Sequence, residues 1–270
     1  MTNSQLGEFD RRADLVRRQL RTFPLKFREL GESGELSDIL DEKESQTLRG
    51  PYVGQQPEMF TEQYLIEPVL HGLGYKNPAA PDYDGTGTHF VRRPTTFRNV
   101  ESKRPDYLLK QVDSSLVCIL EAKAANREQK TERAATADIH EYIEVNAFCK
   151  YLRELDHEYL VAIGTDGLRW SLWRSELKSN DRELISRVDL SEEIRSIAKQ
   201  HDVIEGDSER GPASIRNSLQ QFTDCFSVEK LPEIVNRGSN GGEKEVQTDR
   251  RETESVPPPM SARGTPERDY

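Results

Sequence analysis

The chain has 270 residues, of which 34% are hydrophobic and 32% are charged, and its formal charge at pH 7 is −10. This length predicts one domain of ordinary size plus extra segments, and this charge excludes a protein that coats nucleic acid through bulk attraction. Three scattered cysteines exclude a disulfide scaffold and a zinc site, and without an apolar leader or a run of roughly 20 apolar residues we expect a cytoplasmic protein with no membrane partner.

Residues 1–57 predict a helical extension followed by a loop. Large apolar residues recur at a loose helical spacing over 4–31, and Pro24 interrupts them, which predicts one kinked helix or two short helices that pack against the core. A partner-binding helix is the alternative interpretation. Residues 32–57 are polar and contain several Gly and Pro residues, so we interpret them as a loop with a short helix around 37–48.

The next predicted helix begins near Thr61 and ends at Gly74. Pro68 lies within it, so we expect a bend or a broken first turn. Glu62 falls in the predicted first turn, where a carboxylate is favourable for the helix dipole. The apolar face has the spacing of a helix packed on a core and consists of Leu65, Ile66, Val69, Leu70 and Leu73.

A turn-rich loop follows, and after it positive charges outnumber negative ones. The only acid between residues 89 and 105 is Glu101. A local positive excess can hold a nucleic-acid backbone, because phosphate contacts dominate the affinity of proteins for DNA. A solvated loop is an equally weighted alternative. The candidate DNA-binding residues of this segment are Arg92, Arg93, Arg98, Lys103 and Arg104.

The stretch from Arg104 to Lys123 predicts a β-hairpin. Its segments DYLL and LVCILEA are apolar and rich in strand-forming residues, and KQVDSS between them supplies a turn. Such a hairpin brings Asp106, at the start of the first strand, beside the end of the second. Glu121 and Lys123 share one face there, because strand side chains alternate. Two carboxylates and an ammonium suit a hard divalent cation and an oriented water, although an isolated Glu-x-Lys is most often a surface ion pair.

Residues 137–155 predict a helix that packs on the sheet, since apolar side chains recur there every four residues. This stripe consists of Ile139, Ile143, Ala147, Tyr151 and Leu155. The segments EYLVAIG, TDG and LRWSLW then predict a core strand, a tight turn and a returning strand. In the returning strand Leu168, Trp170 and Leu172 share one side, and we expect Trp173 on the opposite side to be the more exposed tryptophan.

The last structured segments are shorter. Residues 183–201 predict a strand, a turn and a helix with Asp189 or Ser191 as its cap. One more short helix is expected within 213–235. Beyond residue 236 too few apolar residues remain to offset the entropy of ordering, which predicts a disordered tail.

Three pieces of the sequence, in this order, resemble the PD-(D/E)xK nuclease superfamily. Pro105-Asp106 followed by Glu121-Ala122-Lys123 looks like its signature. The flanking sequence is similar to the N-terminal nuclease domain of type I restriction enzyme R subunits. FTEQYLIEPVLHGLGY (60–75) resembles an early helix of that family, and TDGLRWSLW (165–173) resembles a later element. The resemblance covers residues 60–174, and three weak pieces in the right order make it moderately specific.

The resemblance implies an α/β fold with a restriction-endonuclease-like core, in which helices flank a mixed central sheet. This nuclease-like domain is expected over 58–205. Around it we expect the helical extension of 1–57, a linker with a short helix over 206–235 and the disordered tail of 236–270.

The chemistry that the resemblance implies is hydrolysis of DNA phosphodiesters with Mg2+, for which Mn2+ could substitute. In the family's pattern Asp106 and Glu121 hold the metal together with the backbone carbonyl of Ala122. Lys123 then positions or activates the water, and Glu62 supports the site as an additional acid, directly or through water.

Two departures from the family leave other functions open. Tyr151 matches the tyrosine of the family's Q-x-x-x-Y element and is a candidate supporting residue, but Ala147 stands where glutamine is usual. The sequence also lacks the phosphate loop of a helicase motor. We therefore expect a separate helicase, or modification and specificity subunits, as partners in restriction-modification or host defence. The alternatives are a non-cleaving DNA-binding or regulatory module and a DNA repair nuclease.

Overall fold

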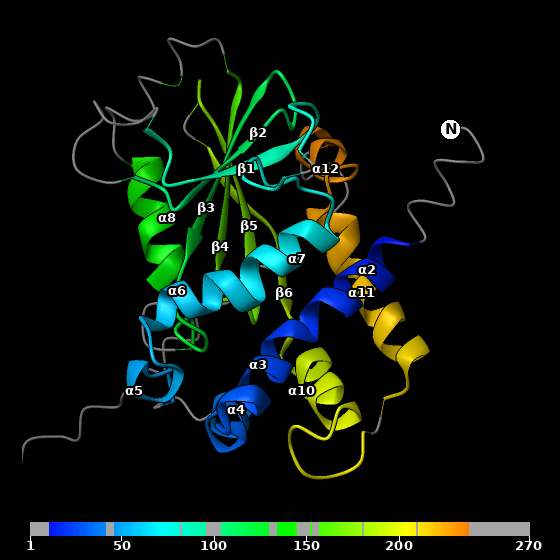
Figure 1. The fold of residues 1–270 in the computed structure, drawn as a ribbon. Helices are drawn as coiled ribbons and strands as arrows, with labels where there is room; N and C mark the ends of the chain where they lie inside the picture. Colours follow the sequence, from blue (N-terminus) through cyan, green and yellow to red (C-terminus); the bar gives the residue numbers. More distant parts are fainter. Residues whose placement is uncertain are drawn as a thin grey trace, which may run out of the picture. The chain divides into compact units, whose positions relative to one another are not determined.

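The chain folds around one mixed β-sheet. The computed structural model describes residues 11–41, 46–81, 83–95, 104–129, 134–144, 152, 157–179, 181–208 and 210–237. Within them, six strands lie side by side in sequence order: β1 (His89–Arg92), β2 (Tyr107–Lys110), β3 (Leu116–Ala122), β4 (Tyr159–Thr165), β5 (Arg169–Glu176) and β6 (Arg182–Asp189) (Figure 1). Neighbouring strands are antiparallel, except that β3 and β4 run parallel. The predicted α/β class with a mixed sheet is confirmed.

The parallel pair β3 and β4 requires a crossover, and helix α8 (Ala134–Glu144) lies on that connection and packs beside both strands. Ile139 and Tyr142 of α8 form a small core with Val117 and Ile119 of β3 on one face of the sheet. The helix begins three residues before the predicted start. Of its predicted stripe, Ala147, Tyr151 and Leu155 lie outside the described residues, as does the side chain of Ile143.

The other face of the sheet carries the main core. Alternate strand residues such as Cys118 and Leu120 enter it, while Val117 and Ile119 point to the α8 side. The helices that contribute to it include α2 (Arg12–Leu20), α3 (Thr22–Leu30), α4 (Ser33–Leu40), α5 (Gly50–Val53), α6 (Pro57–Thr61), the π-helix η1 (Glu62–Ile66), α7 (Glu67–Gly72), α10 (Ser191–Gln200), α11 (Pro212–Phe226) and α12 (Leu231–Arg237). None of the helices within the described ranges is long and apolar enough to cross a bilayer.

The N-terminal segment forms two short helices, α2 and α3, rather than one kinked helix. This is one of the two predicted alternatives. Pro24 is the third residue of α3, where a missing N–H costs little because the first helical N–H groups have no partner within the helix. Phe23 and Phe27 of α3 pack edge-to-face with Phe60 of α6. The extension therefore shares its core with the helix that carries Glu62.

The segment predicted as a linker, 206–235, also contributes to this core. It forms two helices rather than one, and α12 continues to Arg237. Phe222 and Phe226 of α11 pack on Trp170 of β5, and all three are fully buried. Ile215 and Leu219 on the same face of α11 are buried as well, so this helix is a structural part of the domain. The remainder of the predicted tail lies outside the described residues.

The helix predicted to begin near Thr61 begins one turn earlier, at Pro57, a residue that favours the first helical turn. The predicted apolar face is buried, including Leu65, Ile66 and Leu73. Before Pro68 the backbone widens into the π-helix η1, in which the N–H of Glu67 bonds to the carbonyl of Glu62. A π-turn accommodates a proline that cannot donate to the preceding turn. The prediction of Glu62 in a first turn was wrong, because the helix starts earlier.

Gly72 marks a close approach between α7 and α2. A Cβ atom at this position would lie 2.8 Å from the Cα of Val16, and backbone cannot rotate away from the contact. We expect Gly72→Ala to destabilise the fold by about 1–3 kcal/mol through overpacking. Thermal unfolding should then show a fall in Tm of about 2–4 °C for each kcal/mol.

The matched control is Gly34→Ala, since a Cβ at this helical position meets nothing within 4 Å. Its Tm should stay the same or rise slightly, because alanine favours a helix over glycine. Equal Tm values for the Gly72 variant and the parent would show that α2 and α7 separate without cost.

Candidate functional site

The hairpin of β2 and β3 brings together the residues that the sequence singled out. The antiparallel register pairs Tyr107 with Leu120, which places Asp106 beside the end of β3. The Ala122 N–H donates a hydrogen bond of 2.9 Å to Oδ2 of Asp106. Asp106, Glu121 and Lys123 thus meet at one end of the sheet, as the alternation of the two strands predicted.

Lys123 is held by two carboxylates. Its Nζ atom lies 2.7 Å from Oε1 of Glu121 and 2.7 Å from Oδ2 of Asp138 on α8. The hydroxyl of Tyr142, also on α8, donates to Oε2 of Glu121 at 3.1 Å. We call Glu121, Lys123, Asp138 and Tyr142 the lysine clamp. Sequence analysis did not assign Asp138 or Tyr142 to the site.

The clamp keeps the ammonium of Lys123 charged. Burial lowers the pKa of Lys123, but attraction to Glu121 and its bonds to Asp138 outweigh this effect, so the pKa lies above its ordinary value. Held between Glu121 and Asp138, the Lys123 ammonium can orient a water molecule or stabilise negative charge.

The carboxylate of Asp106 also lies close to two glutamates on the neighbouring helix. Oxygen atoms of Glu58 on α6, Glu62 on η1 and Asp106 lie within 4.8 Å of one another. We call these residues the acid triad. Sequence analysis named Glu62 and Asp106 but missed Glu58, which lies four residues before Glu62 and hence on the same helix face. Placing the helix start at Thr61 concealed that relation.

The π-turn orients Glu62 toward a polar network. The Tyr107 hydroxyl lies 2.9 Å from Oε2 of Glu62 and 3.2 Å from Oε1 of Glu67. Arg92 of β1 ion-pairs with both of these glutamates. Residues five apart on an ordinary α-helix lie about 140° apart around its axis and would not share such partners. The wider turn therefore explains how the two carboxylates reach the same tyrosine and arginine.

One carboxylate oxygen of Glu62 accepts no hydrogen bond from the residues that the structure describes. Its side chain is buried, and Oε2 carries the contacts to Tyr107 and Arg92. Oε1 is buried and has no hydrogen-bond partner among the described residues. Leaving a buried carboxylate oxygen unsatisfied is costly, so this atom is a candidate contact for a cation or for a hydrogen-bond donor.

The carboxyl groups of the site have raised pKa values. Burial is the largest cause for Glu58, Glu62 and Asp106. Repulsion by Asp106 adds to the effect at Glu58 and Glu62, and repulsion by Asp138 adds to it at Asp106. Burial and the nearby charge of Asp106 raise the pKa of Glu121 to about 8. Arg93 acts in the opposite direction on all three members of the acid triad. Crowded acids of this kind are typical of metal and catalytic sites.

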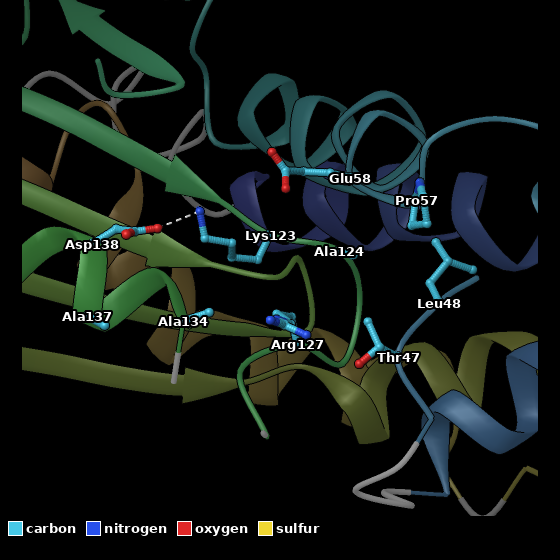
Figure 2. Close-up of a pocket in the computed structure, with 10 residues that line it drawn as sticks. All are labelled: Thr47, Leu48, Pro57, Glu58, Lys123, Ala124, Arg127, Ala134, Ala137 and Asp138. Carbon is cyan, nitrogen blue, oxygen red and sulfur yellow. Dashed lines mark ion pairs between the residues drawn. The ribbon is translucent and has the colours of Figure 1, made fainter. Parts of the chain in front are cut away.

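An open cleft of about 850 Å³ adjoins the site. Figure 2 shows Glu58 entering it from a helix on one side, Lys123 from the end of its strand and Asp138 from the helix opposite. Arg127 lines the same cleft and is exposed. The remaining wall consists of Thr47, Leu48, Pro57, Ala124, Ala134 and Ala137. The cleft gives a substrate or ion access to the candidate site.

The candidate DNA-binding residues differ in their exposure and in their contacts. Arg92 is half exposed and engaged by Glu62 and Glu67. Arg93 and Arg104 are exposed. Arg98, Lys103 and the candidate supporting residue Tyr151 lie outside the described residues.

The donor set of the site consists of carboxylate oxygens, which fit a hard divalent cation rather than a soft metal. The Ala122 carbonyl lies in the same strand end, between Glu121 and Lys123.

Comparison with known protein families, with curated proteins and with solved structures finds no match.

Proposed function

We propose that this chain is a metal-dependent DNA endonuclease with a restriction-endonuclease-like core. The observation that carries the proposal is the meeting of Asp106 with Glu121 and Lys123 at one sheet end, with Glu62 approaching from a helix. This arrangement fits the PD-(D/E)xK pattern that the sequence resembles. The adjoining cleft and its basic residues support access by a nucleic-acid strand.

Asp106 and Glu121, with the Ala122 carbonyl, would hold Mg2+ or Mn2+, and Glu62 would support the site. The bound cation would supply Lewis-acid stabilisation of a phosphate oxygen and a more acidic water. Lys123 has the charge and the fixed position to orient the attacking water and to offset negative charge in the transition state. Asp138 positions that ammonium from α8.

DNA is the proposed substrate, and the proposed biological setting is restriction-modification or host defence. In the type I enzymes that the sequence resembles, the nuclease domain works with a motor, so a separate helicase or modification and specificity subunits are the proposed partners. The exposed Arg93 and Arg104 are candidates for contacts to the DNA backbone.

One observation favours a second function, a DNA-binding or regulatory module that does not cleave. Both carboxylate oxygens of Glu121 are engaged, one by Lys123 and the other by Tyr142. If those contacts persist in solution, Glu121 has less capacity for a metal. Binding of DNA without cleavage in the presence of Mg2+ or Mn2+ would identify this second function.

The test of the nuclease proposal is Lys123→Ala, assayed by conversion of supercoiled plasmid to nicked and linear forms. We expect the parent to cleave with Mg2+ or Mn2+ and to stop in EDTA. The variant should lose about 10²–10³-fold in rate, the usual cost of removing one group that stabilises transition-state charge. Circular dichroism checks the fold, since Glu121 and Asp138 lose their shared partner.

Lys110→Ala is the matched control, because this exposed lysine ends β2 of the same hairpin. It should cleave at the parent rate. A folded Lys123 variant that also cleaves at the parent rate would refute the proposed role of the lysine.

A further inference from the structure

We infer that the cleft beside Lys123 receives an unpaired nucleotide, so that the preferred substrate is a DNA strand that is single at the point of attack. This inference deepens the proposed function and rests on it for the reaction and for the choice of DNA. The observation that carries it is an apolar slot in the cleft, which a duplex cannot fill.

The cleft has a polar part and an apolar part. Its polar part includes Glu58, Lys123 and Asp138. Figure 2 shows that the apolar side chains come from both sides, some from α8 and others from the segments opposite. They form the slot and consist of Leu48, Pro57, Ala124, Ala134 and Ala137. The volume of about 850 Å³ lies in the range of roughly 300–1,000 Å³ that is typical of pockets for small organic ligands.

The slot is rigid on the side opposite α8. The Leu48 N–H donates a hydrogen bond of 3.1 Å to the carbonyl of Ala125, and the side-chain amide of Asn126 donates one of 2.8 Å to the carbonyl of Gln46. The two chain segments that build this side are therefore tied to each other. Because alanine and proline have no side-chain rotamers to lose, a ligand in the slot meets a surface that is already formed.

The apolar slot distinguishes an unpaired strand from a duplex. A duplex presents phosphates, sugars and base edges to a protein, while the faces of its bases stay stacked on one another. A duplex phosphate placed at Lys123 would leave the slot without a partner. An unpaired base has a free face that packs on apolar side chains, which is how enzymes hold a base taken out of the stack. A separate helicase, the partner proposed above, produces strands of this kind.

One basic residue of the cleft is placed to contact the backbone of such a strand. Arg127 is exposed and lines the cleft. It directly follows Asn126, which is fully buried and bonded to Gln46, so the backbone beneath the arginine is fixed. A guanidinium beside an apolar slot can bind a phosphate while the attached base packs in the slot.

An exposed aromatic residue lies next to the same cleft. Tyr52 of α5 is 40% exposed. Gly50, the first residue of this helix, approaches the cleft wall so closely that a Cβ atom on it would lie 3.7 Å from Cδ of Pro57. Proteins that bind single strands combine a positive groove with aromatic rings on which bases stack. Arg127 and Tyr52 supply these two parts beside the slot.

The test compares three labelled DNA molecules by fluorescence anisotropy, in the Asp106→Asn background and with EDTA present so that the DNA stays whole. The molecules are a single strand, the perfect duplex of that strand, and the same duplex with an unpaired loop at its centre. We expect the single strand and the looped duplex to bind about tenfold more tightly than the perfect duplex, since one stacked base contributes about 5-fold to 150-fold in affinity.

Ala137→Leu tests whether the slot is the place of binding. The larger side chain fills part of the slot from an exposed position of α8, and leucine is a good helix former. Affinity for the single strand should fall about fivefold or more, the size of one lost base contact, with a smaller change for the duplex. Ala213→Leu is the matched control, because Ala213 is an exposed alanine of α11 that does not line the cleft. It should bind all three molecules like its parent.

Three outcomes overturn the inference. These are a perfect duplex that binds as tightly as the single strand, an Ala137→Leu variant with the single-strand affinity of its parent, and no binding of any of the three molecules. The two proposals fail differently. Preference for the single strand in a protein that cleaves no DNA with Mg2+ or Mn2+ refutes the nuclease alone. Metal-dependent cleavage that is faster on a perfect duplex than on a single strand refutes this inference alone.

Discussion

Replacing Asp106 with asparagine should abolish metal-dependent DNA cleavage, with a loss of about 10⁴-fold or more. Asp106 belongs to the acid triad and also acts electrostatically on Glu121 of the lysine clamp, so this change removes a ligand of the proposed cation at the point where the two groups meet. A loss of several kcal/mol of transition-state stabilisation corresponds to about this factor, since each 1.36 kcal/mol is tenfold in rate. Plasmid cleavage with Mg2+ and with Mn2+ measures it.

Asparagine is the informative substitution because its side-chain oxygen can still accept the Ala122 N–H that holds the hairpin end. The fold should therefore survive. Asp113→Asn is the control, since this exposed aspartate lies in the turn of the same hairpin and its side chain bonds only to Ser115 in the described structure. A tenfold loss or less for Asp106→Asn would show that Asp106 is not a metal ligand.

The hairpin site could be predicted from the sequence because its geometry is local. A short turn separates two apolar strands, so antiparallel pairing follows, and side-chain alternation then fixes which residues share a face. Asp106, Glu121 and Lys123 were found for that reason. Their proximity needed no knowledge of the rest of the chain.

The rest of the site depends on contacts between distant segments. Asp138 and Tyr142 reach Glu121 and Lys123 from α8 only because the crossover helix packs on β3. Arg92 appeared to be free for phosphate, but β1 places it beside the glutamates of the helix. Pairings of this kind are set by tertiary packing, which periodicity in one segment does not contain.

Glu58 was missed for a different reason. Hydrophobic periodicity begins near Phe60, and the helix start was placed there, whereas Pro57 signals an earlier first turn. The π-turn before Pro68 changes the direction in which the neighbouring side chains point. The spacing of apolar residues in the sequence does not reveal such a turn. With Pro57 as the first helical residue, the four-residue spacing places Glu58 and Glu62 on the same helix face.

The C-terminal helices were underestimated although their pattern was present. Ile215, Leu219, Phe222 and Phe226 recur at helical spacing and are fully buried. Their polar surroundings favoured the interpretation of a linker. The main core could therefore be placed only in part, because its last layer, α11 on Trp170, joins residues that are more than 40 positions apart.

The second large effect concerns DNA affinity. Replacing Arg93 and Arg104 together with glutamine should lower the log-log salt dependence of duplex DNA binding by about 1.8, at about 0.9 for each phosphate contact. Between 50 and 200 mM salt this difference changes the relative affinity by about 12-fold. Both side chains are exposed, Arg93 acts electrostatically on the acid triad, and Arg104 lies two residues before Asp106 in the sequence. Titration of labelled duplexes in an Asp106→Asn background keeps the DNA intact.

Arg92→Gln is the contrasting variant. Its guanidinium already neutralises Glu62 and Glu67, so its loss should change the salt slope by less than half of the amount expected for Arg93. The loss of affinity in the double variant should also be similar for unrelated sequences, because backbone contacts position a protein without reading bases. If the double variant keeps the parent's slope, Arg93 and Arg104 belong to a solvated surface, and the cleft beside Arg127 becomes the expected path for DNA.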